Sequence, residues 1–218
     1  MTSAGRRQRS QGYGNQMLDP TSEFAPADPM PPDIAALRDS TGPVWVFAYG
    51  SLMWDPDVPR AETETALLRG YHRSFCLYSY DYRGTRTQPG LTLGLDHGGG
   101  CRGIAMRLSP AGLGAAIDRL WAREMTAPRV YDMRLLPVRT AYGTRKAFAF
   151  TVRRGHPDYA RRLSLDERAR IIADAAGRRG ACRAYLADTV RHLAVLGSAD
   201  APLQRLAERV NALAVAAR

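Results

Sequence analysis

Residues 44–49 read VWVFAY, a run of apolar, β-branched and aromatic side chains that stops at Gly50. Such a run predicts a buried β-strand, and the glycine predicts a tight turn after it. In the turn from Tyr49 to Leu52, consecutive backbone N–H groups can converge on an anionic oxygen. A Gly-Ser turn after a strand is common, and this one is neither a Walker loop nor a G-x-S-x-G elbow. The turn is therefore a candidate anion cradle and, by itself, a weak signal.

Further strands are predicted downstream of this turn. β-Branched and aromatic composition indicates them at 66–78, 91–95, 103–108, 133–140 and 146–152. Tyr142 and Gly143, between the last two, are typical of a hairpin turn. One helix interrupts the series, predicted from Pro110 to Met125, with Ser109 as its N-cap and Pro110 at its first position.

After Gly155 the sequence is predicted to be helical. Ser164 and Glu167 form a capping box ahead of a helix that should end at Gly177. A second helix is predicted over 181–196 and a third from Ala201 onward. Strands followed by helices indicate an α+β fold rather than alternating β-α-β units.

A chain of 218 residues is an ordinary size for one domain with a real core. Residues 1–32 are rich in Ser, Gly, Gln and Pro, and they bury too little apolar surface to offset the entropy of ordering. A short helix is predicted at 32–38, and the domain proper begins near Pro43. We therefore expect a flexible, disordered N-terminal tail over 1–42 and a single domain over 43–218.

The formal net charge of +10 comes almost entirely from arginine, since Lys146 is the only lysine. The arginines are scattered rather than gathered in one run, so we expect no nucleic-acid partner. A basic surface instead suits an anionic small molecule, because the summed field raises its local concentration.

Cys76, Cys101 and Cys182 are too few and too widely spaced for a disulfide framework or a CxxC metal site. The N-terminus has no apolar signal region, and no run of about 18 apolar residues occurs. We therefore expect reduced thiols, no metal, no membrane segment and a cytoplasmic protein.

The helix predicted over 110–125 carries the most informative polar residue, Glu124. The apolar face of this helix is formed by Leu113, Ile117 and Leu120. Glu124 continues their spacing, so its carboxylate should point towards the core. Burial and the negative end of the helix dipole both raise the pKa of such a carboxylate, towards a value useful for proton transfer. From spacing alone, a structural salt bridge with Arg123 or Arg129 is the commoner outcome.

Other polar residues are less informative. The loop from Arg83 to Arg86 could grip a carboxylate bidentately, although a solvated surface loop is the simpler interpretation. The histidines share no metal-ligand spacing and lie beside no nucleophile in sequence; they are His72, His97, His156 and His192. A carboxylate is therefore the natural acid-base group.

Six ordered segments together resemble the ChaC-like γ-glutamylcyclotransferases. They are VFAYGSLMWDP at 46–56, RGYHRSFCL at 69–77, RGT at 83–85, QPGLTLGL at 88–95, CRGIAMRL at 101–108 and LWAREM at 120–125. A further match, AYLADTVRHLAVLG at 184–197, extends the resemblance to nearly everything after residue 43.

The resemblance implies a mixed β-barrel core with peripheral helices. It also implies cleavage of glutathione to 5-oxoproline and cysteinylglycine, with no metal or cofactor. In its terms Glu124, within Arg123-Glu124-Met125, is the acid-base residue. The other expected substrate-binding residues are Val46, Phe47, Ala48, Tyr49, Gly50, Ser51, Leu52, Arg69 and Arg83.

The chain departs from the family pattern near residue 182. Where relatives often read G-P-N-x-[DE]-Y-L, this sequence has Cys182 and Ala184 in place of the Asn and the acidic residue. The change bears on recognition of the leaving half of the substrate. Two alternatives stay open: a cyclotransferase for other γ-glutamyl amines or dipeptides, and a non-catalytic basic module that binds an anionic partner or RNA.

Overall fold

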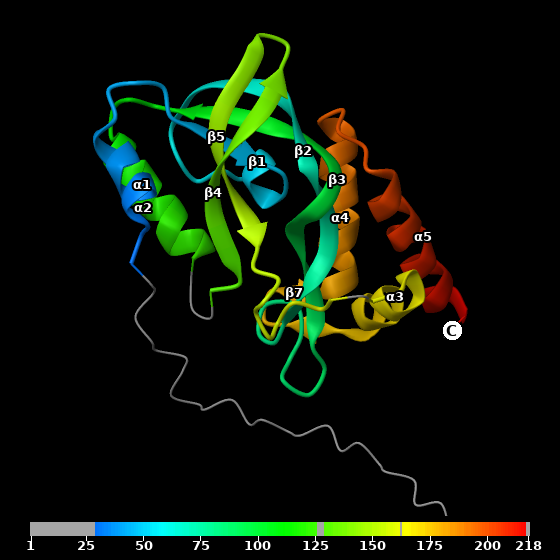
Figure 1. The fold of residues 1–218 in the computed structure, drawn as a ribbon. Helices are drawn as coiled ribbons and strands as arrows, with labels where there is room; N and C mark the ends of the chain where they lie inside the picture. The colour runs from blue at the N-terminus through cyan, green and yellow to red at the C-terminus, as the bar shows by residue number, and fades with distance from the viewer. Residues whose placement is uncertain (1–28, 126–128, 162, 217–218) are drawn as a thin grey trace, which may run out of the picture.

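The computed structural model describes residues 29–125, 129–161 and 163–216. Its strands close into a barrel in the order β1-β3-β2-β4-β5 (Figure 1). Their bounds are β1 Trp45–Ala48, β2 Arg60–Ser79, β3 Gly90–Leu108, β4 Tyr131–Thr140 and β5 Gly143–Val152. β1 pairs in parallel with β5, whereas the other neighbours are antiparallel. The expected mixed β-barrel core is confirmed.

The strand predictions hold, with one correction. β1 is buried at all four of its residues, as the VWVFAY run predicts. The segments 91–95 and 103–108 belong to one continuous strand, because most of the residues between them, 96–97 and 100–102, also pair with β2. The ladder outweighs their low β-propensity. β2 carries a register shift between Arg69 and Tyr71, where Gly70 has a positive φ of 82°.

The predicted hairpin between β4 and β5 is confirmed. Thr140 pairs with Gly143, so the loop consists of Ala141 and Tyr142. Gly143 has a φ of 114°, a value that favours glycine.

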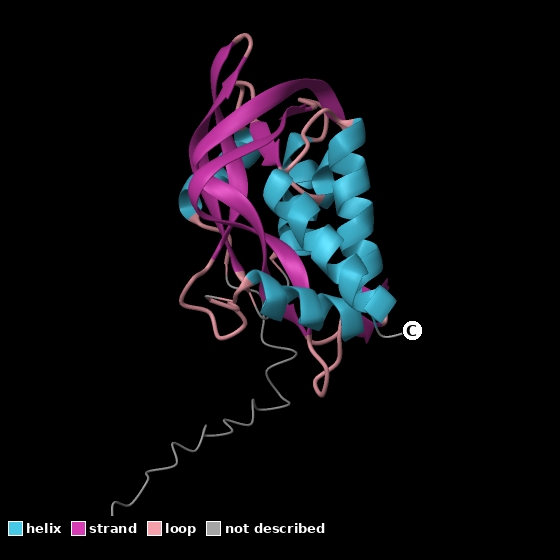
Figure 2. Cartoon of the chain, turned by 90° about the vertical axis from the view of Figure 1, so that its right-hand side faces the viewer, coloured by secondary structure: helices cyan, strands magenta, loops and turns pink. Residues whose placement is uncertain are grey.

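Helices cover the barrel on two sides (Figures 1 and 2). α3 and α4 pack against β3, α5 packs against α3 and α4, and α2 packs against the short N-terminal helix η2. The helical elements are α1 Pro32–Ala35, η2 Ala36–Asp39, η3 Ser51–Met53, α2 Leu113–Glu124, α3 Leu165–Asp174, α4 Cys182–Val195 and α5 Ala201–Ala216. The short helix predicted at 32–38 and the helices predicted over 181–196 and from Ala201 are confirmed.

The predicted start of α2 is wrong. Ser109 is not its N-cap; the Ser109 amide instead donates to the carbonyl of Pro59, at 3.1 Å. Gly112, with a φ of 76°, is left-handed and interrupts the helical path, so α2 begins at Leu113 rather than at Pro110.

The capping box of Ser164 and Glu167 is confirmed, but α3 ends before Gly177. Ala175 is extended, and β6 (Ala176–Gly177) pairs with β7 (Gly180–Ala181). This two-stranded ladder replaces the last turn of the predicted helix.

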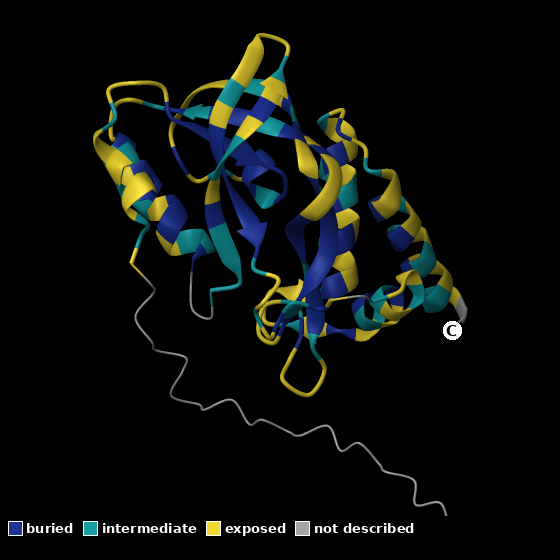
Figure 3. Ribbon diagram, viewed as in Figure 1, coloured by how far each residue is buried: buried dark blue, intermediate teal, exposed yellow. Residues whose placement is uncertain are grey.

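One hydrophobic core joins the barrel to its helices (Figure 3). Phe47 and Phe148 from the barrel and Leu206 from α5 belong to the same cluster. Ile34 of α1 also belongs to it and is fully buried, so part of the segment expected as a tail packs on the domain. The rest of that tail, residues 1–28, lies outside the described residues. No described helix has the length and apolar character needed to cross a membrane.

Candidate active site

A cavity of about 50 Å³ lies where β1 ends. The turn after β1, the C-terminal end of α2, the barrel wall and α4 all contribute to it. Its lining residues are Tyr49, Gly50, Ser51, Leu52, Leu93, Glu124, Tyr131, Phe150 and Tyr185. A volume of this size accommodates a group of a few heavy atoms.

Glu124 is the carboxylate in this cavity. It is the last residue of α2, and 19% of its side chain is exposed. Burial raises the pKa of Glu124 above its ordinary value, while the charge of Arg123 and its hydrogen bond act in the opposite direction. The inward orientation and the raised pKa expected from the helical spacing are both confirmed.

Arg123 joins Glu124 to the turn after β1. Its Nε lies 3.2 Å from Glu124 Oε1. Its Nη2 donates to Ser51 Oγ at 3.3 Å, and its Nη1 donates to the carbonyl of Asp55 at 2.9 Å. The salt bridge considered as the alternative role for Glu124 therefore exists, and it lies within the cavity region rather than apart from it.

The turn has the features of an anion cradle. A Cβ on Gly50 would lie 3.1 Å from Leu93 Cδ2, so a side chain there would crowd the cavity wall. The carbonyls of Gly50 and Ser51 accept bonds from Met53, Trp54 and Asp55. The amides of Gly50, Ser51 and Leu52 have no acceptor among the described residues. They are available to an anionic oxygen.

Tyrosine hydroxyls complete the polar lining. Tyr131 Oη donates to the carbonyl of Leu93 at 3.0 Å. Burial, together with the nearby charge of Glu124, raises the pKa of Tyr185 to about 12 and places those of Tyr49 and Tyr131 well above the ordinary value. All three phenols are therefore protonated near neutral pH and can donate hydrogen bonds.

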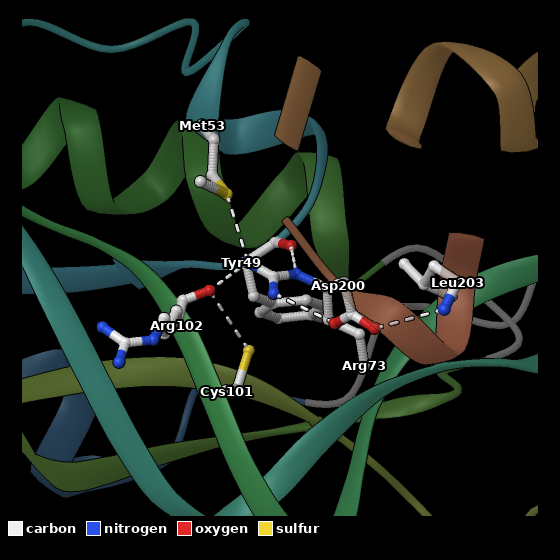
Figure 4. Close-up of polar contacts among 7 residues, drawn as sticks. All are labelled: Tyr49, Met53, Arg73, Cys101, Arg102, Asp200 and Leu203. Atoms are coloured by element: carbon white, nitrogen blue, oxygen red, sulfur yellow. Dashed lines mark hydrogen bonds and ion pairs between the residues drawn. The ribbon is translucent and has the colours of Figure 1, made fainter. Parts of the chain in front are cut away.

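A buried arginine supports the turn from beneath (Figure 4). Arg73, which is 3% exposed, donates to the carbonyls of Tyr49 and Arg102. Its Nη1 lies 3.4 Å from Asp200 Oδ2, at the start of α5. One guanidinium thus ties the end of β1, strand β3 and the C-terminal helix together.

The structure brings only part of the predicted site to the cavity. Val46, Phe47 and Ala48 are fully buried in β1 and do not line it. Arg69 is exposed on β2, beside the Gly70 bulge, and does not line it either. Arg83 lies outside the lining, but its guanidinium carbon is 4.7 Å from the ring centroid of Tyr185.

Sequence reasoning missed Arg123 as a link to the turn, and it missed Tyr131 and Tyr185. Tyr185 falls within the quoted segment 184–197, without an assigned role. Tyr131 stands at the first position of β4, seven residues after the end of α2, and no local pattern marks it. Only closure of the barrel places these side chains beside Glu124.

The departure at residue 182 has a local structural explanation. The Cys182 thiol donates to the carbonyl of Leu91 at 3.1 Å and accepts from the Leu91 amide at 3.4 Å. One buried group thus satisfies both backbone atoms of a strand residue. Ala184 is exposed on the outer side of α4.

The arrangement can transfer a proton and hold an oxyanion. One carboxylate with a raised pKa lines the same small cavity as three protonated phenols and the turn whose amides are free. Among the described residues, no group of three His, Cys, Asp or Glu side chains has the arrangement of a metal site.

Comparison with known proteins places the chain in a family. The model of the ChaC-like protein family matches residues 44–213. A glutathione-specific gamma-glutamylcyclotransferase from Escherichia coli (strain K12) is 37% identical over 182 residues, covering 82% of this chain and 77% of the relative. Gamma-glutamylcyclotransferase 2-3 from Arabidopsis thaliana is 30% identical, covering 77% and 88%.

A solved structure shares the fold. The crystal structure of a γ-glutamylcyclotransferase specific to glutathione from yeast superposes with a TM-score of 0.68, covering 79% of this chain and 99% of that chain at 20% identity. The fold is therefore that of a known enzyme structure, and the sequence match extends through the turn after β1, α2 and α4. This chain belongs to the ChaC-like protein family.

Proposed function

We propose that this chain cleaves glutathione to 5-oxoproline and cysteinylglycine, with Glu124 as the general acid and base. The observation that carries the proposal is the position of the Glu124 carboxylate, in one cavity with the turn from Tyr49 to Leu52. Two relatives that match most of the chain support it: one is named a glutathione-specific gamma-glutamylcyclotransferase and the other a gamma-glutamylcyclotransferase.

The substrate supplies its own nucleophile. In a γ-glutamyl amide the α-amine can reach the δ-carbonyl carbon and form a C–N bond that closes a five-membered ring. The original amide C–N bond then breaks. Holding the amine against the carbonyl supplies several kcal/mol through effective molarity, so no enzyme nucleophile is needed.

Glu124 moves the protons in this scheme. Its carboxylate takes a proton from the substrate ammonium, and the resulting carboxylic acid gives that proton to the nitrogen of the departing amine. As the lactam forms, the ring nitrogen loses a second proton to the regenerated carboxylate, and this proton passes to the released amine. A positioned carboxylate contributes roughly 10²–10⁴-fold to such a reaction. Burial shifts the pKa of Glu124 upward, the direction that helps one carboxyl group to act as base and then as acid.

The cradle and the phenols bind the oxygens. The free amides of Gly50, Ser51 and Leu52 hold the glutamyl carboxylate or the oxyanion that develops on the δ-carbonyl. The hydroxyls of Tyr49 and Tyr185, which are protonated, add donors at the same cavity. Arg69, which the sequence suggested for a substrate carboxylate, has no contact with this cavity among the described residues.

A substitution of Glu124 tests the mechanism. Glu124→Gln should fold normally and lose turnover by roughly 10²–10⁴-fold, because an amide cannot shuttle protons. The raised pKa means that the folded state favours the protonated form, so ionised Glu124 opposes folding at pH 7 and glutamine removes that cost. The variant should therefore be at least as resistant to heat as wild type at pH 7.

The control is Asp118→Asn, on the exposed side of the same helix, where Asp118 pairs with Arg38. Release of 5-oxoproline from glutathione should be unchanged in this control. If Glu124→Gln retained wild-type turnover, the mechanism would be wrong.

A second substrate class remains an alternative because the cavity holds only a few heavy atoms. Other γ-glutamyl amines and dipeptides share the glutamyl half that would enter it. The comparison is 5-oxoproline release from glutathione, γ-Glu-Ala and a γ-glutamyl amine; glutathione should be the best substrate of the three.

The binding-module alternative predicts that Glu124→Gln is harmless and that binding to an anionic polymer falls steeply with salt. We propose that this chain has no nucleic-acid partner. We also propose that it works in a reducing, cytoplasmic location. All three cysteines are buried free thiols, which is consistent with that location.

A further inference from the structure

The candidate site leaves the departing peptide without an assigned partner. The cavity of about 50 Å³ has room for only a few heavy atoms, so the leaving half of a tripeptide must lie outside it, over its rim. One wall of the cavity is Tyr185, and the guanidinium carbon of Arg83 lies 4.7 Å from the centroid of that ring. The rim next to Tyr185 is therefore positively charged.

Arg83 belongs to a platform that consists of the loop over residues 80–89 and the hairpin over residues 176–181. The loop that joins β2 to β3 packs backbone to backbone against the hairpin of β6 and β7. A Cβ on Gly177 of the hairpin would lie 2.3 Å from the carbonyl oxygen of Asp81. Where the loop meets the start of β3, a Cβ on Gly84 would lie 2.0 Å from the Gly90 amide nitrogen. Only glycine permits these approaches.

Hydrogen bonds fix the same two segments together. The amides of Arg178 and Arg179 donate to the carbonyls of Asp81 and Tyr82 at 2.9 and 3.0 Å. Arg83 Nη1 donates to the carbonyl of Arg179. The guanidinium groups of Arg178 and Arg179 both lie over the Tyr82 ring, at 4.4 and 4.6 Å.

Two arginines on this platform have no counter-ion. Arg178 pairs with Asp81 at 2.6 Å, but neither Arg83 nor Arg179 forms an ion pair with any described residue. The Nε and Nη2 of Arg83 have no hydrogen-bond acceptor in the described part of the chain. Ala184, next to Tyr185, supplies no carboxylate that could compete for them.

We propose that Arg83 and Arg179 form a subsite for the terminal carboxylate of the leaving peptide, so that the enzyme selects γ-glutamyl peptides over γ-glutamyl amines. This inference rests on the proposed cyclotransferase function. An extended leaving dipeptide spans at most about 7 Å, and the Arg83 guanidinium carbon lies 4.7 Å from the centroid of the Tyr185 ring, which lines the cavity. Arginine suits a carboxylate because its planar fork donates two parallel hydrogen bonds.

The test compares glutathione with its C-terminal amide, which differs only in lacking the terminal charge. Wild type should have a kcat/KM about tenfold higher for glutathione than for the amide. This factor is at the lower end of the range for a hydrogen bond to a charged group, because the pair is partly exposed. Arg83→Gln should abolish most of this preference by raising KM for glutathione, with kcat/KM for the amide within about twofold of wild type.

Two further variants complete the test. Arg86→Gln removes an exposed arginine from the same loop and should leave the preference unchanged. Arg179→Gln keeps the backbone carbonyl that Arg83 contacts, and it should reduce the preference even if Arg83→Gln folds poorly.

The outcomes separate the two proposals. If wild type releases 5-oxoproline from neither substrate, the proposed function fails. If it cleaves both equally well, or if Arg83→Gln and Arg179→Gln slow both substrates by the same factor, the carboxylate subsite is wrong while the cyclotransferase function stands.

Discussion

At the scale of single residues, the two halves of the candidate site meet at the guanidinium of Arg123. It contacts the proposed acid-base carboxylate on one side and Ser51 of the turn on the other. Its positive charge favours the ionised form of Glu124 and so opposes the effect of burial on the pKa of that carboxyl group. We infer that Arg123 is a positioning residue that also adjusts the basicity of Glu124.

The pH dependence of turnover tests this role. The amine is deprotonated by the Glu124 carboxylate, so activity should fall with decreasing pH as Glu124 becomes protonated. Removing the positive charge in Arg123→Gln raises the pKa of Glu124 further, so the acid limb of kcat/KM should move to higher pH.

The matched control for that shift is Arg119→Gln, on the same helix, whose partner Asp57 is 3.7 Å away at an exposed position. Its acid limb should coincide with that of wild type. An Arg123→Gln limb at unchanged or lower pH would show that Arg123 has no electrostatic effect on the base.

Single residues also show how much of the candidate site can be predicted from the sequence alone. Helical spacing predicts correctly that Glu124 faces inward, because periodicity is a local property. It does not identify Tyr131 or Tyr185, which reach the cavity from β4 and α4 through contacts distant in sequence. Arg69 stands within a family-like motif, yet its exposed place on β2 depends on the bulge at Gly70.

At the scale of elements, α5 is tied to the site through a buried ion pair. Asp200 Oδ1 accepts a bond from the Leu203 amide at 3.2 Å, and its other oxygen pairs with Arg73, whose side chain is 1% exposed. Arg73 in turn holds the carbonyl of Tyr49, directly before the cradle. The C-terminal helix therefore helps to fix the turn after β1.

Asp200→Asn should be strongly destabilising. Asparagine can still cap α5, so the loss reports on the charge. Removing one partner of a buried ion pair costs about 3–5 kcal/mol, because the remaining charge stays buried. The measurement is the free energy of unfolding in urea.

Asp188→Asn provides the control for that measurement. Asp188 pairs with Arg191 at 2.8 Å on the exposed face of α4, where more than half of each side chain is in solvent. Such a pair contributes little, so no measurable change is expected. Equal stability of Asp200→Asn and wild type would contradict a structural role for the Arg73 pair.

Element boundaries show where local patterns fail. The capping box at Ser164 predicts the start of α3 because its hydrogen bonds are made within one turn. Ser109 and Pro110 carry an equally good local signal, yet Ser109 pairs with Pro59 and the left-handed Gly112 delays the helix. The Ser109 contact is a tertiary hydrogen bond that no local pattern reveals, and a glycine at position 112 permits the left-handed conformation without requiring it.

At the scale of the whole molecule, closure of the barrel depends on contacts that no local pattern encodes. β1 pairs in parallel with β5, so Trp45 lies beside Ala147, a residue far from it in the sequence. Strand composition predicts a β-rich core, and the resemblance to a family suggests a mixed barrel. Only the structure shows that the turn after β1, α2 and α4 meet at one cavity.

The net charge of +10 is also a property of the whole molecule, and it should act on the substrate before contact. Glutathione is an anion at neutral pH, whereas its C-terminal amide has no net charge. Raising the ionic strength from about 0.02 M to about 0.3 M shortens the Debye length from about 20 Å to about 6 Å, so the long-range attraction is screened. We expect KM for glutathione to rise with salt while kcat stays constant, and KM for the amide to change little.

The same experiment separates the field of the whole protein from the local subsite. Arg83→Gln removes one of the 31 basic side chains, so most of the net charge remains and the salt dependence of KM for glutathione should persist. Its preference for glutathione over the amide should nevertheless be lost at every salt concentration, because that preference depends on a hydrogen-bonded contact that is short compared with the Debye length. In the contrary outcome, Arg83→Gln would lose both the preference for glutathione over the amide and the salt dependence of KM. Both effects would then arise from the charge of Arg83, and the rest of the basic surface would not attract the substrate.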